Sequence, residues 1–286
     1  MKRLLALILA MALIFCFTAC QVEITTSGET EAEVAKELTA EEVLAKSLEA
    51  TNGVTSVGAD FIMDMEITAE GETVDMDITG AMEFDQEKKL GYMEMKMEAQ
   101  GMNIDAVTYT DFSGEDIVVY TGTMGMWVKQ TTPASEASSL GIGSGGIDGI
   151  KSYLDGVENA TVSKEGDDYK VVGNIGDMLS ETVMNSAMSN VASVDSLTED
   201  VVAQIIDCFK DIEFVIYIDG ETFYLTSFEM DMSKAMKEVF GKIPELAEAN
   251  IEDIKFIAKY DYRDYNADIN VEIPEEALNA AEIPAA

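Results

Sequence analysis

Paired methionines are the feature of this sequence whose residue type and spacing could most readily support chemistry. Because side chains alternate along a strand, a Met-x-Met pair places two thioethers on one face. Four such pairs are Met63/Met65, Met95/Met97, Met124/Met126 and Met230/Met232. Thioether sulfur is a soft ligand that suits Cu(I), but methionine also fills irregular gaps in a core or forms adaptable walls around apolar ligands. No histidine accompanies the pairs, so we favour an apolar role over copper and leave core filler and adaptable wall open.

The sequence carries no pattern of catalytic residues. Histidine is absent, which removes the commonest general base and every Ser-His-Asp or Cys-His arrangement. No Gly-x-Ser-x-Gly elbow and no phosphate-binding loop occurs. Cys208 lies among Ile205, Ile206 and Phe209, so we interpret it as a buried small hydrophobe. The acidic residues within 261–268 lack the ligand order of a calcium loop. We therefore expect neither catalysis, nor a cofactor, nor a bound metal.

Cys20 is the residue for which we expect a covalent modification. Lys2 and Arg3 precede an unbroken apolar run over residues 4–17, which is too short to cross ~30 Å of hydrocarbon and has the features of a signal peptide. The run ends in Phe-Thr-Ala-Cys, which resembles the bacterial lipobox, although Phe17 replaces the usual leucine. Ordinary secretion with an incidental cysteine is the alternative. We expect residues 1–19 to be removed and a diacylated Cys20 to anchor the chain stably.

The charge balance excludes several partners. Cleavage before Cys20 would leave 16 basic and 55 acidic residues, a net charge of −39. Such a chain lacks the basic patch that nucleic acid requires, and anionic lipid headgroups would repel it. We therefore expect membrane contact to come from the acyl anchor, on the outer face of the bacterial cell membrane. The oligomeric state is left open by the sequence.

Residues 20–38 are expected to form an acidic tether, and regular structure is expected from Thr39 onwards. The tether contains five glutamates and no aromatic residue, so it cannot bury enough apolar surface to offset its chain entropy. Thr39 and Glu42 have the spacing of a capping box. An apolar stripe follows, and the Asn52-Gly53 pair predicts the end of this first helix.

Strict alternation of apolar and charged residues comes next and predicts a meander of antiparallel strands. The ranges expected as strands are 57–67, 74–84, 93–99, 102–109, 117–122 and 126–131. A period of two gives a sheet one wet face and one apolar face. The acidic residues therefore belong to the wet face and the methionines to the apolar face.

The second half of the chain combines helices with further strands. A Ser- and Gly-rich loop is expected over residues 133–149. The helices expected from apolar spacing are 147–154, 178–191, 201–209 and 234–249, the last interrupted by Pro244. The strands expected are 161–164 and 169–172 as a hairpin, then 214–219, 223–232, 254–262 and 267–273. Residues 39–286 thus form one α+β domain built on a long antiparallel sheet.

Three segments carry a resemblance to a known family. They are the opening helix Ala40–Lys46, the stretch from Tyr120 through Gly125–Lys129, and the ending Tyr265-Asn266 through Ile273–Ala277. Together with the lipobox and Met-rich strands, they resemble an uncharacterised family of Gram-positive cell-surface lipoproteins, similar in architecture to the LolA and LppX type of lipoprotein carrier. The resemblance covers about residues 38–280. It implies a partly closed sheet, or half-barrel, whose concave apolar face is covered by helices and accommodates acyl chains.

Two functional hypotheses follow. In the first, the chain is a non-catalytic, membrane-anchored lipoprotein that binds a lipid or another apolar ligand in the half-barrel. In the second, it is a surface interaction or scaffold protein with a filled core and no ligand. The first hypothesis predicts a set of residues that line the concave face: Phe61, Met63, Met65, Met76, Ile78, Met82, Met93, Met95 and Met97. The identity of the ligand or partner is left open.

Overall fold

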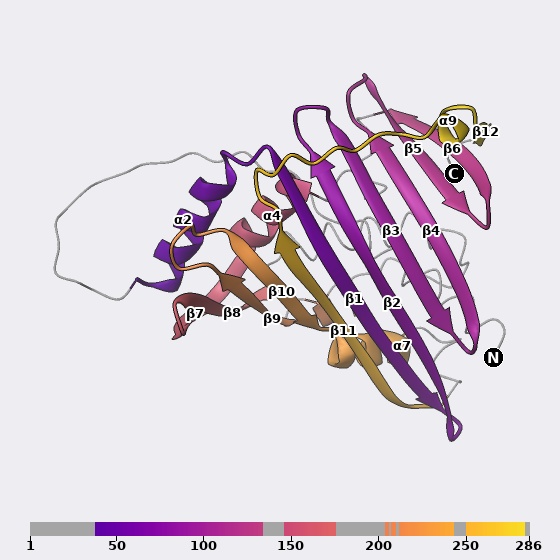
Figure 1. Cartoon of the computed structure of the whole chain (residues 1–286). Helices are drawn as coiled ribbons and strands as arrows, with labels where there is room; N and C mark the ends of the chain where they lie inside the picture. Colours follow the sequence, from indigo (N-terminus) through magenta and orange to yellow (C-terminus); the bar gives the residue numbers. More distant parts are fainter. Residues whose placement is uncertain are drawn as a thin grey trace.

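The computed structural model describes residues 38–133, 146–175, 204–205, 207–209, 212–242 and 250–283. Within these ranges twelve strands form one large sheet, in the order β12-β6-β5-β4-β3-β2-β1-β11-β10-β9-β8-β7 (Figure 1). Every neighbouring pair is antiparallel except β12 with β6. The sheet is not closed, because its two end strands, β12 and β7, each pair on one side only. This open, mostly antiparallel sheet is consistent with the predicted half-barrel.

Helix α2 (Ala40–Thr51) begins and ends where the sequence predicts. The backbone N–H of Glu42 donates to the Thr39 hydroxyl at 3.2 Å, and the Glu42 carboxylate accepts from the backbone N–H of Thr39 at 2.7 Å. This reciprocal pair is the predicted capping box. The buried residues of the helix, which include Val43 and Leu44, fall on one side, as an amphipathic helix requires.

The first six strands follow the predicted alternation. They are β1 (Ser56–Ala69), β2 (Glu72–Asp85), β3 (Leu90–Ala99), β4 (Met102–Asp111), β5 (Asp116–Thr123) and β6 (Met126–Pro133). Three of the hairpins close through two-residue turns whose residues all have positive φ: Glu70-Gly71, Gln100-Gly101 and Met124-Gly125. Positive φ at both positions is the geometry of a type I′ turn, whose twist matches that of the paired strands.

The second half adds five strands and two helices to the same sheet. They are α4 (Gly146–Asp155), β7 (Val157–Glu165), β8 (Asp168–Ile175), β9 (Glu213–Ile218), β10 (Leu225–Asp231), α7 (Ser233–Lys242) and β11 (Ile251–Arg263). All correspond to predicted elements. The predicted helix 178–191 and most of the predicted loop 133–149 lie outside the described residues, and so do residues 243–249. Of the predicted helix 201–209, residues 204–205 and 207–209 are described, and they are helical.

The prediction of a final strand over residues 267–273 is wrong. Residues 267–274 join no ladder, because the chain turns at Asp264 and Asn266, both with φ of 57°. Asn266 then accepts the backbone N–H of Thr55 at 2.8 Å. The segment continues to a short helix, α9 (Glu275–Leu278), and a strand, β12 (Ala281–Ile283), which pairs in parallel with β6. Neither element was predicted.

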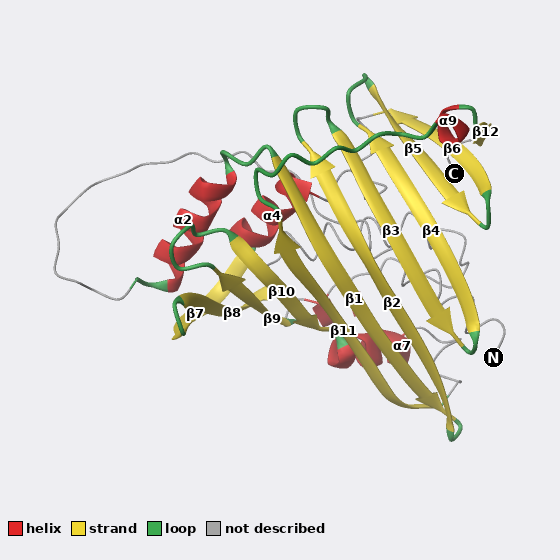
Figure 2. Ribbon diagram, in the orientation of Figure 1, coloured by secondary structure: helices red, strands yellow, loops and turns green. Residues whose placement is uncertain are grey.

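Helices α4 and α7 pack against the sheet from the side that lies behind it in Figure 2. Helix α4 contacts β1, β2 and α2, and α7 contacts β11. The wider prediction, that helices cover the whole concave face, stays a prediction, since three of the expected helices, 178–191, 201–209 and 234–249, lie wholly or partly outside the described residues. Among the helices that the structure describes, none is both long and apolar enough to span a membrane.

Candidate functional site

One face of the sheet is assembled from alternate residues of successive strands. Met63 of β1 pairs with Ile78 of β2, and Ile78 pairs with Met97 of β3. On its other side Met63 pairs with Ala258 of β11. Directly paired residues point to the same side of a sheet, so this row crosses four strands without a charged side chain. We call the surface built from such rows the apolar face.

All nine residues predicted to line a binding site belong to the apolar face. Seven of them are buried: Phe61, Met63, Met65, Met76, Ile78, Met95 and Met97. The other two, Met82 and Met93, pair with each other and are half-buried. All nine belong to or pack against one hydrophobic cluster. The register therefore brings the predicted residues together, while their contact with a ligand remains a prediction.

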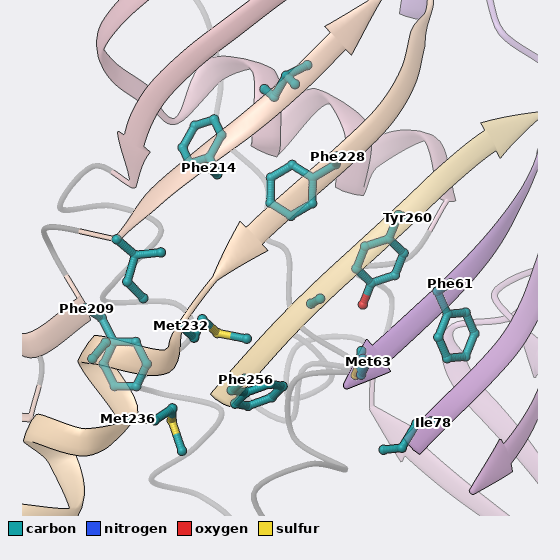
Figure 3. Packing of buried hydrophobic residues seen from close by; sticks show 14 of the residues in the cluster. Phe61, Met63, Ile78, Phe209, Phe214, Phe228, Met232, Met236, Phe256 and Tyr260 are labelled. Carbon is teal, nitrogen blue, oxygen red and sulfur yellow. The ribbon is translucent and has the colours of Figure 1, made fainter. Parts of the chain in front are cut away.

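The apolar face extends beyond the predicted residues into the second half of the chain. Tyr260 of β11 pairs with Phe61, and Phe228 of β10 pairs with both Tyr260 and Ile216 of β9. The Phe61–Tyr260 ring centroids are 5.9 Å apart, those of Phe228–Tyr260 6.2 Å and those of Phe214–Phe228 5.6 Å (Figure 3). These strands were predicted from the sequence, but their aromatic residues were not among those predicted to line the site. Their alternation was the signal that could have identified them.

Gly80 makes room for the central aromatic ring of the apolar face. It pairs with Phe61 on one side and with Met95 on the other. A Cβ at Gly80 would lie 2.4 Å from Cζ of Phe61 and 2.2 Å from the backbone oxygen of Glu94. The Phe61 ring therefore lies over a position that only glycine can occupy without displacing it.

Helical residues complete the hydrophobic cluster. Ile147, Ile150 and Leu154 of α4 belong to it, as do Met236 and Phe240 of α7. Phe209 and Met236 belong to the same cluster as Phe256 of β11 (Figure 3). Thioethers are unbranched and polarisable, and they adapt to irregular neighbours. The apolar face is thus packed against helices through side chains that can rearrange.

The opposite face of the sheet is charged. Lys255 of β11 forms an ion pair with Asp64 of β1, and Arg263 donates a hydrogen bond from Nε to Asp60 at 3.0 Å. The hydrogen bond that the Lys255 ammonium donates to the Asp64 carboxylate raises the pKa of the ammonium. Exposed ion pairs of this kind contribute little to stability, but they show that this face of the sheet is exposed to water. An acyl chain therefore has only the apolar side of the sheet available to it.

A separate hollow of about 510 Å³ lies between Asp207, Cys208 and Ile212, strands β9 and β10, and the start of α7. Carboxylates dominate its lining: Asp207, Glu213, Glu229, Asp231 and Glu238, with one cation, Lys234. Such a lining disfavours the carboxylate head of a fatty acid. Across the described ranges, no three His, Cys, Asp or Glu side chains are grouped so that they could hold a metal ion.

Cys208 lines this hollow, is half-buried and packs against the hydrophobic cluster, so the prediction of a buried small hydrophobe is confirmed only in part. Its thiol donates to the backbone oxygen of Gln204 at 3.2 Å. Desolvation, reinforced by Glu238, raises the pKa of the thiol. Since the thiolate is the nucleophilic form, this environment opposes catalysis by Cys208.

Comparisons with known proteins place these observations in a family context. Residues 39–282 match the family described as "Family of unknown function (DUF6612)". No curated protein sequence matches the chain. Among solved structures, LprF from Mycobacterium bovis is 15% identical with a TM-score of 0.41, over 83% of this chain and 97% of that one. A DUF1329 family protein from Desulfovibrio piger ATCC 29098 is 7% identical with a TM-score of 0.27, over 82% and 93%.

Proposed function

The chain belongs to DUF6612, a family of unknown function, and we propose that it is an extracytoplasmic lipoprotein that binds a lipid or another apolar ligand. Cys20 carries the membrane anchor, and the ligand lies against the apolar face. The observation that carries this proposal is the continuity of that face. Uncharged rows run from β3 through β2, β1 and β11 to β10, and methionines are concentrated on the first three of these strands.

Methionine gives this face a wall whose side chains can repack around a ligand, as a carrier of apolar molecules needs. A chain of CH₂ groups gains about 0.8 kcal/mol for each group that it buries, provided that the wall can follow its shape. Met63, Met65, Met95 and Met97 each have three rotatable side-chain bonds and can repack around an inserted chain. A wall of β-branched residues would resist such repacking, because their χ1 angle is restricted.

The same burial favours a second candidate, an interaction protein with a filled core. Seven of the nine lining residues are buried by other residues of the protein, so a ligand must separate the helices from the sheet or displace side chains. The two candidates therefore differ in one measurable property. A carrier takes up an apolar molecule saturably, and a filled core does not.

The test uses a fluorescent fatty-acid probe and the chain from residue 20 with Cys20→Ser. The described residues begin at Leu38, so this chain keeps every described helix and strand. We expect saturable binding, weakened at least tenfold by Met65→Gln or Met95→Gln, which put an amide into the apolar face. Asp64→Asn on the charged face is the matched control and should leave binding unchanged. Circular dichroism and thermal unfolding establish that each variant is folded.

Absence of saturable binding by the unsubstituted chain would remove the carrier and leave the interaction protein. Equal weakening by Asp64→Asn would instead show that the probe binds somewhere other than the apolar face. Either result contradicts the proposal.

A further inference from the structure

Three methionines at one end of the sheet are exposed, in contrast to the buried methionines of the apolar face. The exposed fraction is 53% for Met102, 75% for Met124 and 71% for Met126. They lie in or next to the turns of the β3–β4 and β5–β6 hairpins. These turns are at the same end of the sheet, because β3 to β6 are consecutive antiparallel strands.

The exposed methionines on the strands continue the apolar face to its edge. Met126 pairs with Thr123 of β5, Thr123 with Ala106 of β4, and Ala106 with Met95 of β3. Met102 is joined in the same way through Ala99 to Met76 of β2. A molecule that slides along the apolar face from its buried centre would therefore leave it past Met102 and Met126.

The β5–β6 hairpin also lacks charge in a strongly charged chain. Residues 117–128 contain no acidic or basic side chain, whereas 26% of the whole chain is charged and its net charge is −37. Trp127 lies on the opposite face of the hairpin from Met126 and is half-buried, with its ring centroid 6.0 Å from that of Tyr109. Tryptophan and tyrosine prefer the boundary between water and lipid, where one end of the ring is apolar and the other is wet.

We propose that the tip of the β5–β6 hairpin inserts into the interfacial region of a zwitterionic lipid bilayer, with Met102 at the same end of the sheet. Insertion of this tip removes the thioethers of Met124 and Met126 from water without burying a charge, because residues 117–128 contain no charged side chain. A second copy of the chain is a poorer occupant, because two molecules that each carry a net charge of −39 after cleavage before Cys20 repel each other. This contact rests on the proposed function and extends it, because it brings the open edge of the apolar face to the acyl chains of the bilayer.

Trp127 is the only tryptophan of the chain, so its fluorescence reports directly on the hairpin. The experiment mixes the chain from residue 20, carrying Cys20→Ser, with phosphatidylcholine vesicles whose acyl chains are brominated near the glycerol. We expect a blue shift and quenching by bromine. The double variant Met124→Gln/Met126→Gln should lower the vesicle partition coefficient at least tenfold. Ile62→Gln, at a 51% exposed position on the charged face, is the matched control and should not.

Three outcomes would overturn the inference. The first is an unshifted and unquenched spectrum, and the second is equal partitioning of the double variant and the parent chain. The third is a methionine-dependent dimer in sedimentation with no vesicle binding, which would assign the hairpin to a contact between copies. Binding of the fatty-acid probe, measured in the absence of vesicles, tests the proposed function alone, whereas vesicle binding tests the membrane contact. A double variant that binds the probe normally but not the vesicles supports both, and vesicle binding by a parent chain that never binds the probe leaves only the membrane contact.

Discussion

Replacing Gly80 by alanine tests the central packing of the apolar face. The new Cβ would lie 2.2 Å from the backbone oxygen of Glu94 and 2.4 Å from Cζ of Phe61. The carbonyl belongs to the paired strand β3 and cannot rotate away, so the strands must separate or the ring must leave its place. Overpacking of this kind costs about 1–3 kcal/mol, and contact with backbone puts this site toward the upper end. A loss of about 2–3 kcal/mol corresponds to roughly 4–12 °C in Tm for a domain of this size.

Gly91 offers the matched control on the same face of the neighbouring strand. It pairs with Phe84 of β2, and a Cβ there would meet its nearest neighbour, a ring carbon of Phe112, at an ordinary 3.6 Å. Alanine at this position removes the entropic cost of glycine in a strand and should be neutral or stabilising by about 0.5–1 kcal/mol. Urea unfolding followed by circular dichroism measures both variants. A Gly80→Ala chain as stable as the parent, or a Gly91→Ala chain equally destabilised, would refute the packing argument.

Three further predictions concern the anchor, the first helix and the alkaline limit of stability. Cys20→Ser should release the protein from the membrane fraction, and a variant that still pellets with membranes after a high-salt wash would contradict the anchor. Thr39→Ala removes the N-cap of α2 and should lower the unfolding free energy by about 1 kcal/mol, whereas Glu49→Ala on the exposed side of the helix should change it by less than about 0.5 kcal/mol; equal effects of the two would reject the cap. Burial and Glu94 raise the pKa of Tyr92 to about 12, so the unfolded chain loses this proton first as the pH rises above 10, and stability should fall between pH 10 and 12. Tyr92→Phe should make that fall shallower in denaturant titrations at several pH values, and an unchanged slope would show that Tyr92 does not contribute.

The strands of the first half could be predicted because apolar and charged residues alternate along them, as expected for a sheet with one packed and one solvent-exposed face. A strand with one wet and one packed face must alternate, and residues 57–109 do so almost without interruption. Alternation gives the face of each residue but not its partner. Strand β11 therefore could be predicted, whereas its place beside β1, nearly two hundred residues earlier, could not, and neither could the aromatic rows that Tyr260 and Phe228 add to the apolar face.

The C-terminal segment shows where alternation misleads. Ala267, Ile269, Val271 and Ile273 alternate like a strand, but Asn266 holds the chain to the start of β1 instead of continuing β11. Its side-chain N–H donates to the Tyr224 hydroxyl at 3.1 Å, while its oxygen accepts from Thr55. Asn and Asp adopt the left-handed conformation more easily than other residues with a side chain, so the pair at positions 264 and 266 was the available signal for a turn.

The candidate site was predicted in composition but not in extent. The sequence identified nine residues of one face, and the strand register brings all nine together. Phe61 reaches its position only because Gly80 leaves room in the next strand, and no periodicity reveals such a pairing. The exposed ends of the face at Met124 and Met126 follow the same alternation as the buried methionines, so the sequence could not separate them.

The most direct test of the proposed function is a mass spectrum of an organic extract of the purified protein. The chain carrying Cys20→Ser is exported in a bacterial host, purified without detergent and extracted with chloroform and methanol. We predict an apolar molecule at close to one equivalent per chain, which is reduced at least tenfold in the Met95→Gln variant and retained in Asp64→Asn. An extract that contains no such molecule, from a chain that also fails to bind a fatty-acid probe saturably, would contradict ligand binding on the apolar face.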